Sequence, residues 1–185
     1  RFTWLKVGGP AEVFFRPHNE TELIRFIRFL PINTSQTILG NSSNLLIRDG
    51  GVPGVVIKLG SGFTYIKING NYITIGAGTA SMSAARKAQI AGLSGLEFMA
   101  GIPGTAGGVL YMNAGAYGRE IKDVFVCARA IDNLGKSHNI NKNSISFGYR
   151  CTNLSSKLVI TEVTLRGEPS SPAKIKSEMQ KIQKQ

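Results

Sequence analysis

The sequence predicts an α+β protein made of two parts, a small mixed α/β part followed by a larger part rich in strands. Residues 19–30 carry apolar side chains at helical spacing, residues 63–78 alternate apolar and polar side chains around an Asn-Gly turn, and two glycine-rich stretches interrupt these patterns. The 185 residues, of which 42% are apolar, are enough for one ordinary domain or two small ones with a real core.

The first part, residues 1–61, contains one amphipathic helix. Asn19 and Glu22 have the spacing of a capping box, in which side chains satisfy the unpaired amides of the first turn. Pro31 ends the helix, because proline cannot continue the hydrogen-bond ladder. The apolar side chains at i, i+3, i+4 and i+7 are Leu23, Phe26, Ile27 and Leu30, and the predicted strands are 11–17, 37–40 and 54–59.

The second part, residues 62–168, begins where helical spacing gives way to alternation. Strands 63–68 and 71–78 flank an Asn-Gly turn typical of a hairpin. An alanine-rich helix begins at Ser81 and extends to about Ala91. The later elements are a β-type segment at 121–132, a turn at 133–136 and a second β-type segment at 157–167.

The last segment, residues 169–185, is predicted to be a linker followed by a polar helix. Ile175, Met179 and Ile182 form its apolar stripe, and lysines dominate the rest. Such a stripe needs a partner surface, which we expect from a further C-terminal domain. The residues from about Glu168 onward are therefore expected to be dispensable for folding.

The charge is strongly basic, with 22 Lys and Arg against 11 Asp and Glu. A nucleic-acid partner, a solvated basic surface and attraction of polyanionic small ligands are all compatible with this excess. The basic residues are scattered singly and no basic run carries interleaved aromatics, which disfavours nucleic acid. No apolar run is long enough to span a membrane, and the first residues, 1–9, lack the apolar block of a signal peptide. We expect a cytoplasmic monomer with a small-molecule ligand and no nucleic-acid or membrane partner.

The two cysteines, Cys127 and Cys151, lack CxxC spacing and have no nearby histidine cluster. We expect free thiols and no metal site.

The first candidate site is the loop "LGNSSNLLIRDGG", residues 39–51, between two predicted strands. Gly, Asn and Ser tolerate unusual backbone angles, so consecutive amides can converge on an anion such as a pyrophosphate. A polar β-turn is the alternative. The loop is neither a Walker motif nor a GxGxxG motif before a helix.

The second candidate site is the stretch "AGIPGTAGGVLYMNAGAYGRE", residues 100–120. A short helix beginning at Thr105 would aim its first amides at a phosphate or an electron-rich ring edge. Tight packing of a helix on a sheet is the alternative. Two such loops about sixty residues apart favour a long ligand that contacts both, such as a dinucleotide.

The third candidate is "FGYR", residues 147–150. A surface aromatic beside a surface cation is one interpretation, and a clamp for a carboxylate or enolate is the other, because guanidinium is a fixed, permanently charged donor.

Four segments in this order and spacing resemble the UDP-N-acetylenolpyruvoylglucosamine reductase family: 3–15, 39–51, 92–121 and 147–150. The resemblance extends to about Gly167 and implies the FAD-binding fold of the vanillyl-alcohol oxidase-like flavoproteins, two α/β subdomains with FAD between them. It implies non-covalent FAD, NADPH as hydride donor, and reduction of UDP-N-acetylglucosamine enolpyruvate to UDP-N-acetylmuramate for peptidoglycan.

The resemblance also assigns roles to residues. Arg150 is the expected catalytic group, which steadies the developing enolate, and Tyr149 and Arg150 are expected to bind substrate. We expect the loop amides together with Ser42, Ser43 and Asn44, rather than a lysine, to hold the pyrophosphate, so that Lys and Arg substitutions outside the loops leave FAD binding nearly intact. The expected cofactor-binding residues are Gly40, Asn41, Ser42, Ser43, Asn44, Leu45, Ile102, Pro103, Gly104, Thr105, Gly107, Gly108, Asn113, Ala114, Gly115, Ala116, Tyr117 and Gly118.

The chain departs from the family pattern at three points. Ser42 replaces a common glycine, so this turn must accept a Cβ or be reshaped, and Cys151 replaces an expected polar residue. The family's protonating serine and late glutamate belong to a third domain that begins about where this sequence stops. We therefore expect the FAD-binding portion of the enzyme, unable to complete the reaction alone.

Two alternatives stay open. One is another non-covalent FAD oxidoreductase of the same fold, because neither loop contains the His or Cys that tethers FAD covalently in such enzymes. The other is a basic nucleic-acid-binding module.

Overall fold

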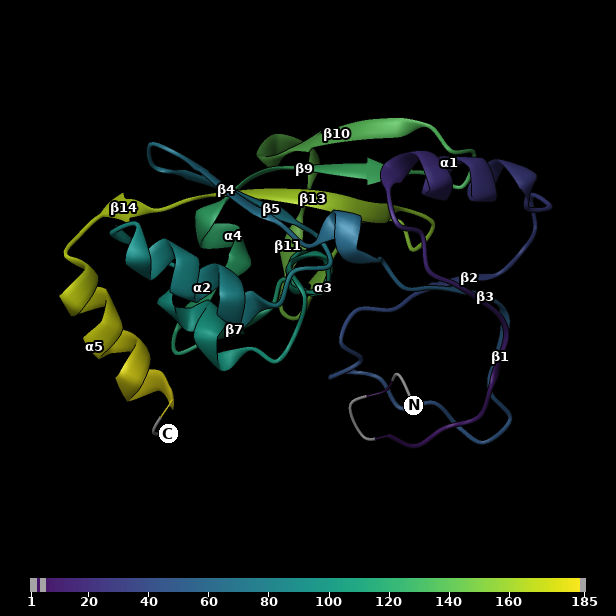
Figure 1. The fold of residues 1–185 in the computed structure, drawn as a ribbon, viewed down its shortest axis with the longest axis horizontal. Coiled ribbons are helices and arrows are strands. Elements are labelled where there is room, and N and C mark those ends of the chain that lie inside the picture. Colours follow the sequence, from purple (N-terminus) through teal and green to yellow (C-terminus); the bar gives the residue numbers. More distant parts are fainter. Residues whose placement is uncertain (1–2, 4–5, 184–185) are drawn as a thin grey trace.

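The computed structural model describes residue 3 and residues 6–183. The first part of the chain forms a small parallel sheet with strand order β1-β3-β2. Helix α1 lies between β1 and β2 in the chain and beside one end of the larger sheet (Figure 1). The elements of this part are β1 Ala11–Phe15, α1 Glu20–Phe29, β2 Gln36–Ile38 and β3 Val52–Ile57.

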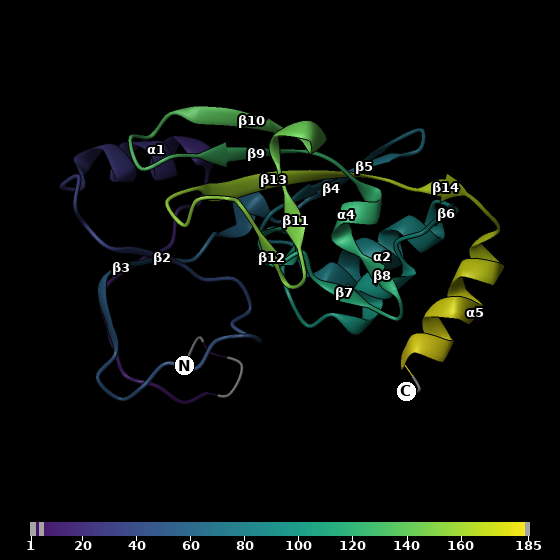
Figure 2. The same ribbon diagram turned by 180° about the vertical axis from the view of Figure 1, so that it is seen from behind.

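The second part is built on a five-stranded antiparallel sheet with order β10-β9-β13-β5-β4. Its strands are β4 Ile66–Asn69, β5 Tyr72–Gly76, β9 Phe125–Ile131, β10 Ser137–Asn141 and β13 Val159–Arg166. The helices gather on one side of this sheet, and the view from behind shows the same layering (Figures 1 and 2). They are α2 Ser81–Ile90, α3 Ala106–Tyr111, α4 Ile121–Val124 and α5 Pro172–Gln183.

Short elements connect these layers. The two-stranded ladders pair β6 Leu93–Ser94 with β14 Glu168–Pro169, β7 Gly115–Ala116 with β8 Arg119–Glu120, and β11 Phe147–Gly148 with β12 Cys151–Thr152. The 3₁₀ turns are η1 Ser61–Phe63, η2 Glu97–Gly101 and η3 Lys142–Ser144.

Helix α1 forms where its spacing predicts it. The Asn19 side chain accepts a hydrogen bond from the amide of Glu22 at 2.9 Å, which confirms the predicted cap, while the Glu22 carboxylate takes the amide of His18 at 2.8 Å. Leu23 and Ile27 are buried, and the Phe26 ring stacks on a ring of β1. The helix therefore packs its apolar face into a cluster that it shares with β3, β9 and β13.

The small sheet and the large sheet share a hydrophobic core. Ile131 of β9 and Val159 of β13 belong to the cluster formed by Leu23, Ile27 and the buried side of β3. Polar contacts reinforce this packing, because Glu20 at the start of α1 forms an ion pair with Arg129 of β9. The two sheets are thus fixed relative to each other.

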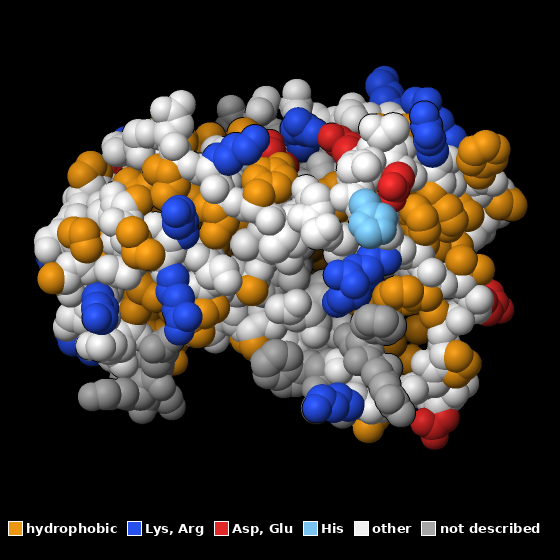
Figure 3. Space-filling model, viewed as in Figure 1, with side chains coloured by type: hydrophobic (Ala, Val, Ile, Leu, Met, Phe, Trp, Pro, Cys, Tyr) orange, Lys and Arg blue, Asp and Glu red, His pale blue; other side chains and the backbone are white. Residues whose placement is uncertain are grey.

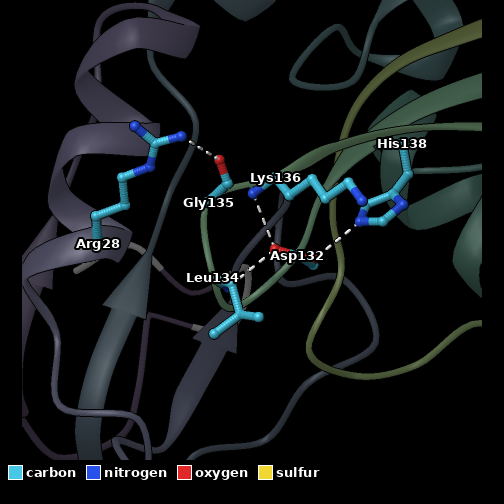
Figure 4. Close-up of polar contacts among 6 residues, drawn as sticks. All are labelled: Arg28, Asp132, Leu134, Gly135, Lys136 and His138. Carbon is cyan, nitrogen blue, oxygen red and sulfur yellow. Dashed lines mark hydrogen bonds and ion pairs between the residues drawn. The ribbon is translucent and has the colours of Figure 1, made fainter.

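The turn between β9 and β10 makes a second polar contact with α1 (Figure 4). Arg28 donates to the carbonyl of Gly135 at 3.4 Å. Asp132 orders this turn by accepting from the amides of Leu134 and Lys136 at 2.9 Å and by contacting the His138 ring at 2.7 Å. Burial alone would raise the pKa of Asp132, but these hydrogen bonds outweigh it and lower that pKa.

Two sequence predictions about strands are wrong in part. Residues 121–124 are not extended: Glu120 and Asp123 form a capping box that makes them a helical turn, and the strand begins at Phe125. Strand β10 was missed because "SHNIN" contains only one strong strand former, Ile140. The hairpin β4–β5 and helix α2 lie within the predicted ranges.

The predicted role of the tail is also corrected. Ile175 and Met179 of α5 are 2% and 6% exposed and belong to the core of the larger part, where α5 packs on η2 and α2. The apolar stripe is therefore covered by this chain itself. The expectation that the tail is dispensable for folding no longer follows.

We expect Ile175→Ala to lower the free energy of unfolding by about 2–4 kcal/mol, because it removes buried methylene groups from a closed core. Chemical denaturation of the purified chain measures this change. The matched control is Ile90→Ala at the exposed end of α2, where Ile90 is 68% exposed and the expected change is below about 0.5 kcal/mol. Equal stability of the two variants would mean that α5 does not contribute to the core.

The described surface shows two further features. Lys and Arg side chains are spread over the face in Figure 3 in separate places. Among the described helices, none has the length and apolarity needed to cross a bilayer.

Candidate functional site

The two glycine-rich stretches meet in one cavity of about 560 Å³. The first stretch comes from the loop after β2, and the second from the segment between η2 and the end of α3. Arg150 reaches the same cavity from the turn between β11 and β12. The predicted site residues that line it are Gly40, Asn41, Ser42, Ser43, Asn44, Leu45, Ile102, Pro103, Gly104, Thr105, Gly108, Ala114 and Arg150.

A second cavity of about 480 Å³ continues from the first. Gly40, Asn41, Thr105 and Gly108 line both, so the two volumes are parts of one elongated cleft. The second cavity also includes Gly107 and two cations that the sequence patterns do not indicate, Arg16 and Lys58.

Hydrogen bonds across the cleft hold the two stretches together. Asn41 donates through Nδ2 to the carbonyl of Gly104 at 3.3 Å, and Ser81 of α2 donates its amide to the same carbonyl at 3.0 Å. The Ser81 hydroxyl also contacts the carbonyl of Ile102. A Cβ at Gly40 would lie 2.7 Å from the Thr105 hydroxyl, so only glycine permits this approach.

The backbone amides of the two stretches differ in what they offer a ligand. The amides of Ala106 and Gly107 at the start of α3 already donate to the carbonyls of Thr79 and Ala77, at 2.9 and 3.0 Å. The expectation that these amides face a ligand is therefore wrong. The amides of Ser43 and Asn44 in the first loop have no acceptor among the described residues, so they remain available to an anion.

Two glycines on the cavity wall are not required by the fold. A Cβ at Gly104 would meet Val109 Cγ2 at 3.4 Å, which is ordinary contact, and a Cβ at Gly108 would lie 3.6 Å from the nearest atom of Thr105. Neither glycine has a positive φ. The missing side chains therefore leave space in the cavity itself. Gly107 differs, because its Cβ would approach Ala77 Cβ to 3.0 Å.

Backbone strain concentrates in the predicted site. Five described non-glycine residues have positive φ, and four of them are predicted site residues: Ser42 at 56°, Asn113 at 40°, Tyr117 at 55° and Arg150 at 56°. Left-handed angles cost a residue with a side chain roughly 1–2 kcal/mol, and such strain is enriched at functional sites. At Ser42 the turn keeps the conformation that suits glycine and accommodates the Cβ.

Asn113 does not line either cavity, and its assignment as a cofactor-binding residue stays a prediction. It is fully buried, donates to the carbonyl of Gly148 at 2.8 Å and accepts from the amide of Lys122 at 3.3 Å. Thr152 makes a parallel connection by donating to the carbonyl of Tyr111 at 2.9 Å. These bonds fix the β11–β12 hairpin, and hence Arg150, against the end of α3.

Gly115, Ala116, Tyr117 and Gly118 line a separate groove of about 390 Å³, not the elongated cleft. Arg150 lines both and therefore connects them. Tyr149 also lines this groove, is 86% exposed, and places its ring 5.8 Å from the Arg150 guanidinium carbon.

Lys58 is the main charge that sequence reasoning missed. Its amino group donates to the carbonyl of Gly40 at 2.6 Å. Burial, and secondarily the neighbouring Arg16, lower the pKa of Lys58. A single lysine after a strand carries no motif, so only the fold reveals its position. An anion in the cleft would offset both causes.

Among the described residues, no cluster of His, Cys, Asp and Glu is placed to hold a metal ion, and Cys127 and Cys151 are free thiols.

Comparison with known proteins identifies related chains. The FAD binding domain family matches residues 11–141. The UDP-N-acetylenolpyruvoylglucosamine reductase of Azorhizobium caulinodans is 46% identical over 180 residues, which cover 97% of this chain and 58% of that protein. The reductase of the same name from Paramagnetospirillum magneticum is 45% identical over 181 residues, covering 98% and 59%. The chain therefore spans about three fifths of the curated relatives it matches.

Solved structures agree with the fold. The crystal structure of UDP-N-acetylenolpyruvylglucosamine reductase (MurB) from Thermus caldophilus superposes with a TM-score of 0.87 at 34% identity, covering 99% of this chain and 65% of that chain. The 6-hydroxy-D-nicotine oxidase of Arthrobacter nicotinovorans has a TM-score of 0.66 at 15% identity, covering 89% and 38%, and shows the fold alone.

Proposed function

Because the chain belongs to the FAD binding domain family, we propose that its elongated cleft holds FAD non-covalently and that it is the cofactor-binding portion of a UDP-N-acetylenolpyruvoylglucosamine reductase. This assignment rests mainly on one observation. Gly104 and Gly108 present bare backbone to the cleft although neither packing nor φ requires glycine there. A large flat ligand lying against this wall explains why side chains are absent.

The residues of the cleft match the parts of FAD. Lys58 and Arg16 line the second cavity, and the amides of Ser43 and Asn44 belong to the first; Gly40, whose carbonyl Lys58 contacts, lines both. Cations and free amides on either side of Gly40 suit an anionic diphosphate. The wall with Gly104 and Gly108 suits a planar ring system. Lys58 and Arg16 therefore argue against the expectation that no cation outside the loops contributes to FAD binding.

The chemistry that bound FAD supplies is hydride transfer, from NADPH to the enolpyruvyl double bond of UDP-N-acetylglucosamine enolpyruvate. Arg150 of this chain, held at the mouth of the cleft by the Asn113 contact, would stabilise the negative charge that develops on the substrate. The neighbouring carbon must also receive a proton from a general acid. We assign that acid to the part of the enzyme outside residues 1–185 and expect this chain alone to bind FAD without completing turnover.

The same assignment suggests a pathway, a cellular compartment, an oligomeric state and small-molecule partners. We propose that the protein acts in peptidoglycan synthesis in the cytoplasm, as a monomer, with the UDP-sugar and NADPH as its small-molecule partners.

Mixing the purified chain with FAD and removing unbound cofactor tests the proposal. We expect the visible absorption bands of oxidised flavin to remain with the protein, and flavin fluorescence to titrate to one site per chain. A colourless protein that instead binds DNA in a salt-sensitive manner would favour the nucleic-acid alternative and overturn the assignment.

We expect Lys58→Met to weaken FAD binding by about tenfold, because charge-assisted hydrogen bonds contribute about 1.5–3 kcal/mol and this side chain is only partly buried. A fluorescence titration measures the affinity. The wild-type affinity should fall as the pH rises through the lowered pKa of Lys58, since the anion prefers the protonated amine. Lys58→Met should lose this alkaline dependence.

The matched control is Lys67→Met, because Lys67 is exposed on β4 and lines neither cavity. It should bind FAD like the wild type. Equal FAD affinities for Lys58→Met and the wild type would show that the FAD diphosphate does not bind beside Lys58.

A further inference from the structure

Three segments meet at one junction beside the cleft: the end of η2, the turn between β7 and β8, and the last turn of α5. The Tyr117 hydroxyl donates to the carbonyl of Ile182 at 2.8 Å. A Cβ built on Gly101 would lie 2.8 Å from Tyr117 Cε2 and 3.2 Å from Ile182 Cγ2. The Tyr117 ring and the Ile182 side chain therefore both lie against the bare backbone of Gly101.

The conformation of Tyr117 needs support from outside its own turn. Tyr117 and Gly118 form the two-residue turn of the β7–β8 hairpin, with φ of 55° and 77°. Both values are typical of a turn that favours Asn and Gly, and a tyrosine adopts the first position at a cost. Its side chain is 48% exposed, so burial alone does not hold it. The contacts with Ile182 and Gly101 are the support that the structure provides.

Helix α5 is fixed by the core, so its last turn gives the Tyr117 hydroxyl a stable hydrogen-bond acceptor. Ile175 and Met179 bury its apolar face in the core. The carbonyl of Ile182 lies in the last turn, where helix carbonyls lack an intrahelical partner. The Tyr117 hydroxyl satisfies this acceptor, so the bond benefits both the helix end and the turn.

The junction connects directly to the proposed FAD site. Gly101 precedes the residues 102–105 that line the cleft. The Tyr117 turn lines the adjacent groove, which shares Arg150 with the cleft. A change in the junction therefore moves two segments of the site at once.

We propose that Tyr117 is a positioning residue that fastens both site segments, 101–105 and 115–118, to α5 and thereby keeps the cleft in the shape that binds FAD. This inference rests on the proposed function for its ligand. It departs from the sequence expectation that Tyr117 contacts the cofactor, because the hydroxyl faces α5.

Two variants test the proposal on the purified 185-residue chain, in which α5 is part of the core. Tyr117→Phe removes only the hydrogen bond, and Gly101→Ala displaces the ring but keeps the hydroxyl. Each should weaken FAD binding about threefold to tenfold, as expected for one net hydrogen bond. In the FAD-free chain, amide hydrogen exchange of residues 101–105 and 115–118 should accelerate by a similar factor, while the thermal midpoint stays near that of the control.

The control is Tyr72→Phe, since Tyr72 is 44% exposed on β5 and lines none of the three cavities. Wild-type exchange in both segments of Tyr117→Phe and Gly101→Ala would overturn the proposal, as would unchanged FAD affinity with accelerated exchange. A wild-type chain that binds no FAD would overturn the proposed function instead, and the exchange measurement would still decide whether Tyr117 fastens the two segments.

Discussion

Gly104→Val is expected to weaken FAD binding by about a hundredfold or more while the unfolding of the FAD-free chain changes little. A Cβ at position 104 meets only ordinary contacts at 3.4 and 3.6 Å, and φ is not positive, so the protein itself can accept a side chain. The added carbons instead enter the cavity on the wall that we assign to the flavin. A hundredfold loss of affinity corresponds to about 2.7 kcal/mol, which lies at the upper end of the roughly 1–3 kcal/mol that overpacking typically costs.

Fluorescence titration with FAD and thermal unfolding without FAD measure the two effects separately. Gly50→Val is the matched control, because Gly50 has open space around its Cβ position and does not line the cleft. It should keep wild-type affinity. Unchanged FAD affinity in Gly104→Val would show that the Ile102–Thr105 segment does not contact FAD.

Local sequence patterns correctly predict the elements whose structure depends on residues close to one another in the chain. Helix α1 follows from apolar spacing and the Asn19 cap, and the β4–β5 hairpin follows from alternation around Asn69 and Gly70. Each depends on residues within a few positions of one another. The α+β class and the FAD-binding fold followed from these elements together with the resemblance of four ordered segments.

Long-range packing explains the elements that the sequence analysis placed wrongly. The stripe of Ile175 and Met179 correctly indicates a buried face, but periodicity does not say what covers it, and the answer is η2 and α2. Likewise the glycines after Thr105 suggest free helix amides, yet carbonyls of residues 77 and 79, nearly thirty positions earlier, take them. In both cases the partner lies outside any sequence window.

Sequence patterns also fail to assign roles to individual site residues. Glycine content indicates both stretches, but it does not distinguish Gly107, where a Cβ would crowd Ala77, from Gly104 and Gly108, where the absent side chains leave space in the cavity. Asn113 was selected for FAD although its buried amide holds the hairpin of Arg150. Lys58 was not selected, since its proximity to Gly40 arises from strand pairing.

Arg150→Ala is expected to lower kcat by about 10² to 10³ in an active reductase that carries these residues, with FAD affinity within about threefold of wild type. Arg150 is the apex of a two-residue turn with φ of 56°, and the bonds from Asn113 to Gly148 and from Thr152 to Tyr111 hold that turn beside the cleft. A fixed cation at this place stabilises charge that develops only in the transition state, so its loss should act on kcat more than on binding.

Steady-state kinetics with NADPH and UDP-N-acetylglucosamine enolpyruvate, alongside FAD titration, measure both quantities. Arg150→Lys should lie between wild type and Arg150→Ala, because it keeps the charge but loses the planar donor fork. Arg166→Ala removes an exposed arginine at the far end of β13 and should leave kcat unchanged. A kcat within threefold of wild type would show that the enolate is stabilised by another group, and a parallel loss of FAD would make Arg150 a cofactor-binding residue instead.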